Sequence, residues 1–133
     1  MADSVYLGNP NLKRANVSQE WTKKEVQEYA KCMNDPQYFI ENYIMIVSLD
    51  EGLVPFKMYD FQKEMVGTFH SNRFTICKLP RQSGKSTTII AYLLHYVLFN
   101  ASVNVAILAN KAATARDLLG RLQLAYEHLP KWL

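Results

Sequence analysis

The sequence predicts an α/β fold in which a strand, loop, helix, strand and helix form part of a parallel sheet, preceded by a helical segment and a β-hairpin. A short run of β-forming residues, 74–78, leads into a glycine-containing loop. The loop opens onto a long apolar run that ends at Phe99, as expected of a helix buried beneath a sheet. A second apolar run, 103–109, has the near-continuous hydrophobicity of a strand covered on both faces. A helix with regularly spaced apolar residues follows it to about His128, and the crossover is expected to be right-handed.

The loop at residues 79–87 reads Leu-Pro-Arg-Gln-Ser-Gly-Lys-Ser-Thr, and its context is that of a phosphate-binding loop. Backbone N–H groups in such a loop line a nest for anions, and the following helix adds unpaired N–H groups and the positive end of its dipole. Gly84 lets the backbone approach the phosphates, Lys85 would reach the β- and γ-phosphates, and the Ser86 hydroxyl would ligate Mg²⁺. The sequence therefore predicts a site for a nucleotide and Mg²⁺. Leu79 stands where the pattern G-x-x-x-x-G-K-[ST] has its first glycine, so the loop is a deviant one.

A simpler interpretation is a strand, turn and helix with a lysine at the helix N-terminus. It does not explain the neighbouring Arg81, nor a cation placed where the helix dipole disfavours one. Upstream of the loop, Gln62 lies in a predicted helix, 59–71, in an aromatic setting. A glutamine amide has a donor and an acceptor that match N7 and N6 of adenine, although a helical glutamine is commonly just a solvated residue. Its position before the loop favours a role at the base.

Length and composition are those of one domain or part of one, because 133 residues that are 49% apolar suffice for a real core. The net charge of +3 permits a polyanionic partner without indicating one, since no run of Lys and Arg exceeds two residues. Cys32 and Cys77 lack the spacing of a metal site and are expected to be reduced thiols. The N-terminus lacks a signal-peptide pattern, and the longest apolar run, 89–99, is too short to span a bilayer. We expect a cytosolic protein without a membrane segment.

The first 21 residues are polar and are expected to form an irregular arm before an incomplete domain over residues 22–133. Thr22 and Glu25 have the spacing of a capping box, which predicts a helix to about Met33. The sequence Asn34-Asp35-Pro36 ends this helix and starts another.

Apolar β-formers on both sides of Asp50-Glu51-Gly52 predict a β-hairpin over residues 44–56. The same run resembles a Walker B strand, in which apolar residues end in a Mg²⁺-binding Asp and a catalytic Glu. It comes before the phosphate-binding loop, whereas the usual order is after it, and a glycine turn follows at once. Both facts favour the hairpin, so Asp50 and Glu51 are expected to be turn residues.

Four strings of residues resemble a known family: Asn-Pro-Asn-Leu-Lys-Arg-Ala-Asn at 9–16, Trp21-Thr22, Tyr-Asp-Phe-Gln at 59–62 and Arg-Gln-Ser-Gly-Lys-Ser-Thr at 81–87. Together they resemble the ATPase domain of the large terminase subunits of myovirus-type tailed bacteriophages, over essentially the whole chain. The resemblance implies a partial RecA-like P-loop NTPase domain from an ATP-driven motor that packages double-stranded DNA and carries a C-terminal metal-dependent nuclease. It also implies three protein partners, namely the portal, the small terminase subunit and the rest of the large subunit, in the cytoplasm of an infected bacterium.

The same resemblance assigns roles to individual residues. Lys85 and Ser86 would hold the phosphates and Mg²⁺, and Gln62 would read adenine. Arg81 would be an arginine finger supplied in cis, because a planar guanidinium fork suits the oxygens of the γ-phosphoryl transition state. Arg81 and Lys85 are therefore the predicted catalytic residues. The remaining predicted nucleotide contacts are Gln82, Ser83, Gly84 and Thr87.

The sequence departs from the family after residue 109. A Walker B strand should follow, yet the acidic residues there are Asp117 and Glu127, both on a predicted helix. The nuclease and its acidic cluster do not appear either, so this portion is expected to bind ATP without hydrolysing it alone. Two alternatives stay open: a fragment of a helicase-type or translocase-type P-loop ATPase, and a non-enzymatic accessory protein that docks on the packaging motor.

Overall fold

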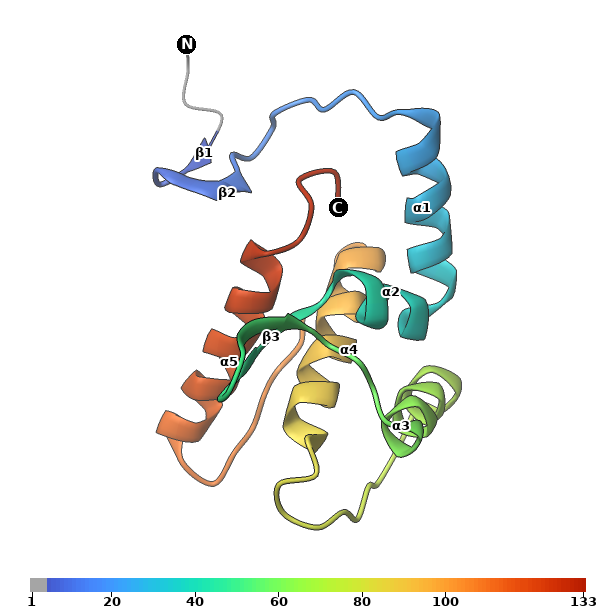
Figure 1. Cartoon of the computed structure of the whole chain (residues 1–133), viewed down its shortest axis with the longest axis vertical. Helices are drawn as coiled ribbons and strands as arrows, with labels where there is room; N and C mark the ends of the chain where they lie inside the picture. Colours follow the sequence, from blue (N-terminus) through green and yellow to red (C-terminus); the bar gives the residue numbers. More distant parts are fainter. Residues whose placement is uncertain (1–4) are drawn as a thin grey trace.

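The computed structural model describes residues 5–133, which form a mixed α/β structure of five helices and two separate two-stranded antiparallel sheets (Figure 1). The elements in order are β1 (Val5–Tyr6), β2 (Asn9–Lys13), α1 (Lys23–Asn34), α2 (Pro36–Tyr43), β3 (Met45–Ser48), β4 (Gly52–Pro55), α3 (Asp60–Ser71), α4 (Lys85–Phe99) and α5 (Ala112–Glu127). Helix α4 lies at the centre and contacts α2, α3 and α5. No helix among the described residues has both the length and the apolar character needed to cross a membrane.

The core forms around α4 because this helix is apolar on nearly all sides. Ala91 and Leu94 of α4 are buried against Phe39 and Ile40 of α2 and Val66 of α3, in one continuous cluster. Burial of this apolar surface is the main stabilising contribution to the fold. It holds α4 against α2 and α3, and the loop before α4 lies at the end of this packed helix.

Local signals at the helix ends are confirmed at the start of α1 and α2. The Thr22 hydroxyl accepts the Glu25 N–H at 3.2 Å, and the Glu25 carboxylate accepts the Thr22 N–H at 2.7 Å. The Asp35 carboxylate then caps α2, whose first residue is Pro36. At α5 the N-cap is Lys111, and no side chain caps this helix.

A carboxylate joins α1 to α2. Glu28 accepts hydrogen bonds from the Tyr38 hydroxyl at 2.7 Å, the Tyr43 hydroxyl at 2.9 Å and the Lys31 ammonium at 3.0 Å. The bond from Tyr38 is the largest cause that lowers the pKa of Glu28, to about 2, and those from Lys31 and Tyr43 act in the same direction. These bonds hold the side of α1 that carries Glu28 against α2.

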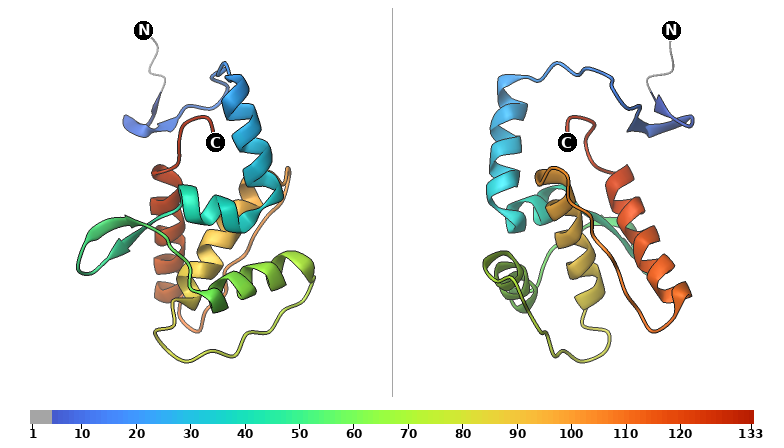
Figure 2. Two further views of the ribbon diagram at one scale, coloured as in Figure 1. Left: turned by 45° about the vertical axis from the view of Figure 1, so that its right-hand side comes forward. Right: turned by 180° about the vertical axis from the view of Figure 1, so that it is seen from behind.

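The predicted hairpin is confirmed as β3 and β4, which pair antiparallel from Met45 opposite Pro55 to Ser48 opposite Gly52. Gly52 has a φ of +74°, the left-handed conformation that the turn requires. In the left view of Figure 2 the hairpin extends outward from the helices. The arm at residues 1–21, predicted to be irregular, contains the small β1–β2 hairpin, while residues 1–4 lie outside the described part of the chain.

The strands predicted at 74–78 and 103–109 are not formed within residues 5–133, where neither segment pairs with another strand and no parallel sheet is assigned. Both run as extended chain, one before α4 and one after it (Figure 2). Apolar side chains in both segments face solvent: Ile76 is 98% exposed and Leu108 is 89% exposed. The reason is physical, because a strand needs the backbone hydrogen bonds of neighbouring strands, which the described residues do not supply here.

His95 is a satisfied core residue, as its position in an apolar helix indicates. It is 3% exposed, its Nε2 donates to the Cys32 carbonyl oxygen at 2.8 Å, and its ring packs against Phe39 and Phe99. Burial lowers the pKa of His95 below its ordinary 6.5, with His70 of α3 adding to the effect and the Cys32 carbonyl opposing it.

We expect the free energy of unfolding to fall as the pH drops below 6.5, the ordinary pKa of His95. The unfolded chain takes up this proton more readily than the folded one, so the contribution is present above 6.5 and is lost below it. Urea unfolding between about pH 5 and pH 8 measures the slope, which His95→Gln should reduce. Equal slopes in the two proteins would contradict this assignment.

Candidate functional site

The predicted phosphate-binding loop ends at a left-handed residue. Gly84 is the N-cap of α4, with a φ of +71°, a conformation that glycine adopts at little cost. Gln82 is also left-handed, with a φ of +59°, so the chain turns sharply on both sides of Ser83. This geometry places Lys85 and Ser86 in the first turn of α4, where backbone N–H groups have no partner within the helix.

The carbonyl oxygen of Pro80 organises the side chains of the loop. It accepts one hydrogen bond from Lys85 Nζ at 3.0 Å and another from the Ser83 hydroxyl at 3.0 Å. The ammonium is therefore folded back over the loop instead of extending along α4. At the other side, the fully buried Thr88 donates its hydroxyl to the Gly84 carbonyl at 3.0 Å and fixes the helix start.

A cavity of about 1030 Å³ lies beside the loop. Three segments line it: residues of the β3–β4 hairpin, the stretch from Phe56 to Gln62, and the loop between Leu79 and Thr87. Pockets that hold cofactors commonly measure about 300–1,000 Å³, so the cavity has room for a nucleotide. Glu51 is the carboxylate among the described lining residues, and it lies at the tip of the hairpin.

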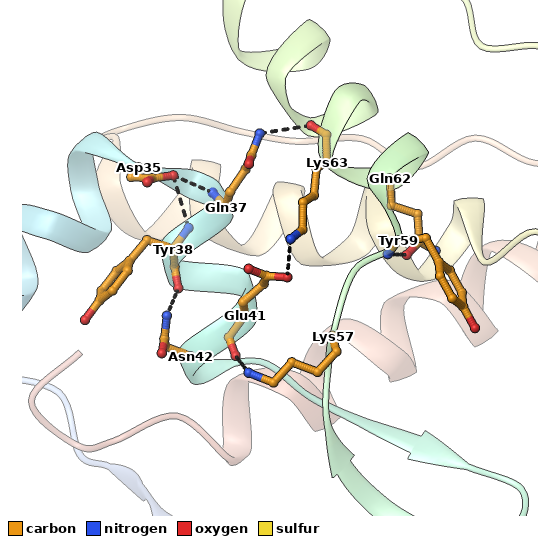
Figure 3. Close-up of polar contacts among 9 residues, drawn as sticks. All are labelled: Asp35, Gln37, Tyr38, Glu41, Asn42, Lys57, Tyr59, Gln62 and Lys63. Atoms are coloured by element: carbon orange, nitrogen blue, oxygen red, sulfur yellow. Dashed lines mark hydrogen bonds and ion pairs between the residues drawn. The ribbon is translucent and has the colours of Figure 1, made fainter.

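Gln62 occupies the boundary between this cavity and the loop, and it is only 2% exposed. Its Oε1 accepts the Tyr59 N–H at 2.9 Å, as Figure 3 shows, and its Nε2 donates to the Ser83 carbonyl at 3.3 Å. A Cβ built on Gly84 would come within 2.6 Å of Gln62 Nε2. The amide therefore lies directly against the backbone of the loop.

Tyr59 and Phe61 stack on each other at the same cavity, with ring centroids 6.0 Å apart and planes inclined by 10°. Tyr59 is 70% exposed, which leaves much of this aromatic pair open to a ligand. Aromatic faces of this kind are suited to stacking against planar bases.

The structure brings five of the predicted site residues to one cavity: Gln62, Gln82, Ser83, Gly84 and Thr87. Lys85 and Ser86 lie immediately beyond it in the first turn of α4. Arg81 is exposed and does not line the cavity, and it makes no ion pair with any residue in the range 5–133. The Arg81 side chain therefore lies next to the cavity, and no acidic residue in the range 5–133 holds its guanidinium in place.

The β3–β4 hairpin lines one side of the cavity, and the sequence did not predict this. Ile46, Ser48 and Glu51 reach the cavity only because the hairpin folds beside the loop, and no local pattern reports that contact. The sequence did predict the hairpin itself, and the turn at Asp50 and Glu51 is confirmed. Across residues 5–133 there is no cluster of three or more His, Cys, Asp or Glu side chains able to hold a metal ion unaided.

A comparison with the models of known protein families finds no match for this chain.

Proposed function

We propose that the chain binds ATP with Mg²⁺, as the nucleotide-binding portion of a DNA-packaging motor of the large-terminase type. One observation carries the nucleotide part: a left-handed Gly84 caps α4 and is followed directly by Lys85 and Ser86, beside a cavity of about 1030 Å³. A helix N-terminus with free N–H groups and a neighbouring ammonium is a site for a polyphosphate.

The residues of the loop have distinct parts in this proposal. Phosphate oxygens accept hydrogen bonds from the N–H groups at the start of α4, and Lys85 exchanges the Pro80 carbonyl for a phosphate oxygen. The Ser86 hydroxyl, together with phosphate oxygens, would offer the hard oxygen donors that Mg²⁺ prefers, and the ion would neutralise phosphate charge. Arg81, with no ion-pair partner in residues 5–133, is available to the γ-phosphate.

The base is proposed to lie against Gln62, Tyr59 and Phe61, which line the same cavity as the loop. Stacking on the aromatic pair would hold any base, whereas a polar group at its edge would favour adenine.

The terminase part of the proposal rests on the resemblance in residues 9–16, 59–62 and 81–87. This resemblance also implies a RecA-like parallel sheet. In that sheet the exposed segments 74–78 and 103–109 would pair with further strands. Their exposed apolar side chains support this, since β-forming residues such as Ile76 are stabilised by neighbours on both faces. Double-stranded DNA, the portal, the small terminase subunit and the rest of the large subunit are the proposed partners, in the cytoplasm of the infected host.

Affinity is expected to rise from AMP to ADP to ATP in the presence of Mg²⁺, because the loop contacts the outer phosphates. Isothermal titration calorimetry with each nucleotide measures the series. Thermal unfolding provides a second check, since a ligand at one hundred times its Kd stabilises the folded state by about 2.7 kcal/mol. Equal affinities for AMP and ATP would show that the loop does not hold the polyphosphate.

A further inference from the structure

We infer that Gln62 is a positioning residue for the phosphate-binding loop, and that it sets the affinity for the polyphosphate of any nucleotide. This inference rests on the proposed function and deepens it. A residue that only reads adenine acts on the base alone. A residue that holds the loop acts on every ligand that the loop binds.

The orientation of the amide follows from its first contact. Gln62 is the third residue of α3, and its Oε1 accepts the N–H of Tyr59, the N-cap residue of that helix, at 2.9 Å. An amide oxygen fixed in this way leaves the Nε2 group to point in the other direction, toward the loop. There Nε2 donates to the Ser83 carbonyl at 3.3 Å. Because the side chain is 2% exposed, both bonds are shielded from water and from exchange with it.

The second contact is steric. The Cα of Gly84 lies so close that an added Cβ would be 2.6 Å from Gln62 Nε2. The amide therefore supports the peptide between Ser83 and Gly84, which is the peptide that leads into α4. The N–H groups of the first helical turn and the Lys85 side chain follow directly from it. A shift of this peptide moves all the groups that are proposed to contact phosphate.

Inorganic tripolyphosphate separates the two roles, because it has the phosphates of ATP and no base. We expect Gln62→Met, which keeps the length of the side chain and removes its hydrogen bonds, to weaken binding of ATP, GTP and tripolyphosphate by a similar factor of roughly five- to tenfold. Calorimetric titration of the full chain with the three ligands measures the factors.

The chain offers a matched control. Gln37 is a half-buried glutamine whose Nε2 also donates to a backbone carbonyl, that of Lys63 at 3.0 Å, and it joins α2 to α3 away from the loop (Figure 3). Gln37→Met is expected to leave all three affinities unchanged. A loss confined to ATP in Gln62→Met, or no loss at all, would overturn the positioning role.

The outcome for Lys85→Ala distinguishes this inference from the function on which it rests. Unchanged tripolyphosphate binding in Lys85→Ala would remove the proposed phosphate site itself. Should Gln62→Met fail to fold, the wild-type protein still gives an answer by NMR. The Gln62 side-chain NH₂ resonances are expected to shift on addition of tripolyphosphate while those of Gln37 stay in place, and an unshifted Gln62 amide would overturn the inference.

Discussion

Replacing Lys85 with alanine is expected to weaken ATP binding by roughly 10- to 100-fold, the effect of losing one charged hydrogen bond of about 1.5–3 kcal/mol. The ammonium already lies over the loop, 3.0 Å from the Pro80 carbonyl, so a phosphate oxygen in that position meets a positive charge. A neutral methyl group removes this charge and leaves the phosphates to the backbone N–H groups, Mg²⁺ and Arg81. Titration of a fluorescent ATP analogue in the presence of Mg²⁺ measures the change.

Lys111 provides the control, because it is also a lysine at the start of a helix, the N-cap position of α5. Lys111→Ala is expected to bind the analogue as the unmodified chain does. If both alanine variants bound equally well, the loop at 79–87 would not be the nucleotide site.

The second large effect is expected at Gly84. Alanine in this left-handed conformation costs about 1–2 kcal/mol, and the new Cβ would approach Gln62 Nε2 to 2.6 Å. Either the Gln62 amide or the first turn of α4 must move to relieve this contact, and either movement alters the loop. We expect Gly84→Ala to lower the free energy of unfolding by about 2–3 kcal/mol and to weaken triphosphate binding. Urea unfolding and nucleotide titration on the same preparation measure both.

Gly52 separates the two causes. It has a nearly identical φ of +74°, yet a Cβ there would meet nothing within 4 Å. Gly52→Ala therefore measures the backbone strain alone, and the excess loss in Gly84→Ala measures the close contact with Gln62. Adding Gln62→Ala to Gly84→Ala should recover that excess, because the atom in contact is then gone. An equal decrease in the free energy of unfolding in Gly52→Ala and Gly84→Ala would mean that the Gln62 side chain moves away from the new Cβ at no cost.

Local features of this fold were predictable from sequence, and the features that depend on distant contacts were not. The capping box at Thr22, the break at Pro36 and the turn at Gly52 each depend on residues within a few positions, and each is present. The segments 74–78 and 103–109 have strand-forming residues, but a strand also requires a paired neighbour. None is supplied within residues 5–133, and these segments remain extended and exposed.

The site divides in the same way. The order Gly84, Lys85, Ser86 predicted a helix start at the end of the loop, and the structure has it. The bond from Lys85 to the Pro80 carbonyl was not predicted. The amide contacts of Gln62 were not predictable, because they depend on the packing of α3 against the loop. The hairpin wall was not predictable either, since its position follows from the way β3 leaves α2.

The Pro80 carbonyl, which accepts hydrogen bonds from both Lys85 and Ser83, affects the entropy of ligand binding. A free lysine side chain has about 2 kcal/mol of rotamer entropy, which a ligand must normally remove when it orders the chain. Lys85 is already ordered by its bond to the Pro80 carbonyl, so most of that loss belongs to folding and not to association. A phosphate oxygen that replaces the carbonyl exchanges one acceptor for a better one. The Ser83 hydroxyl, which keeps its own bond to Pro80, satisfies the carbonyl that the ammonium leaves.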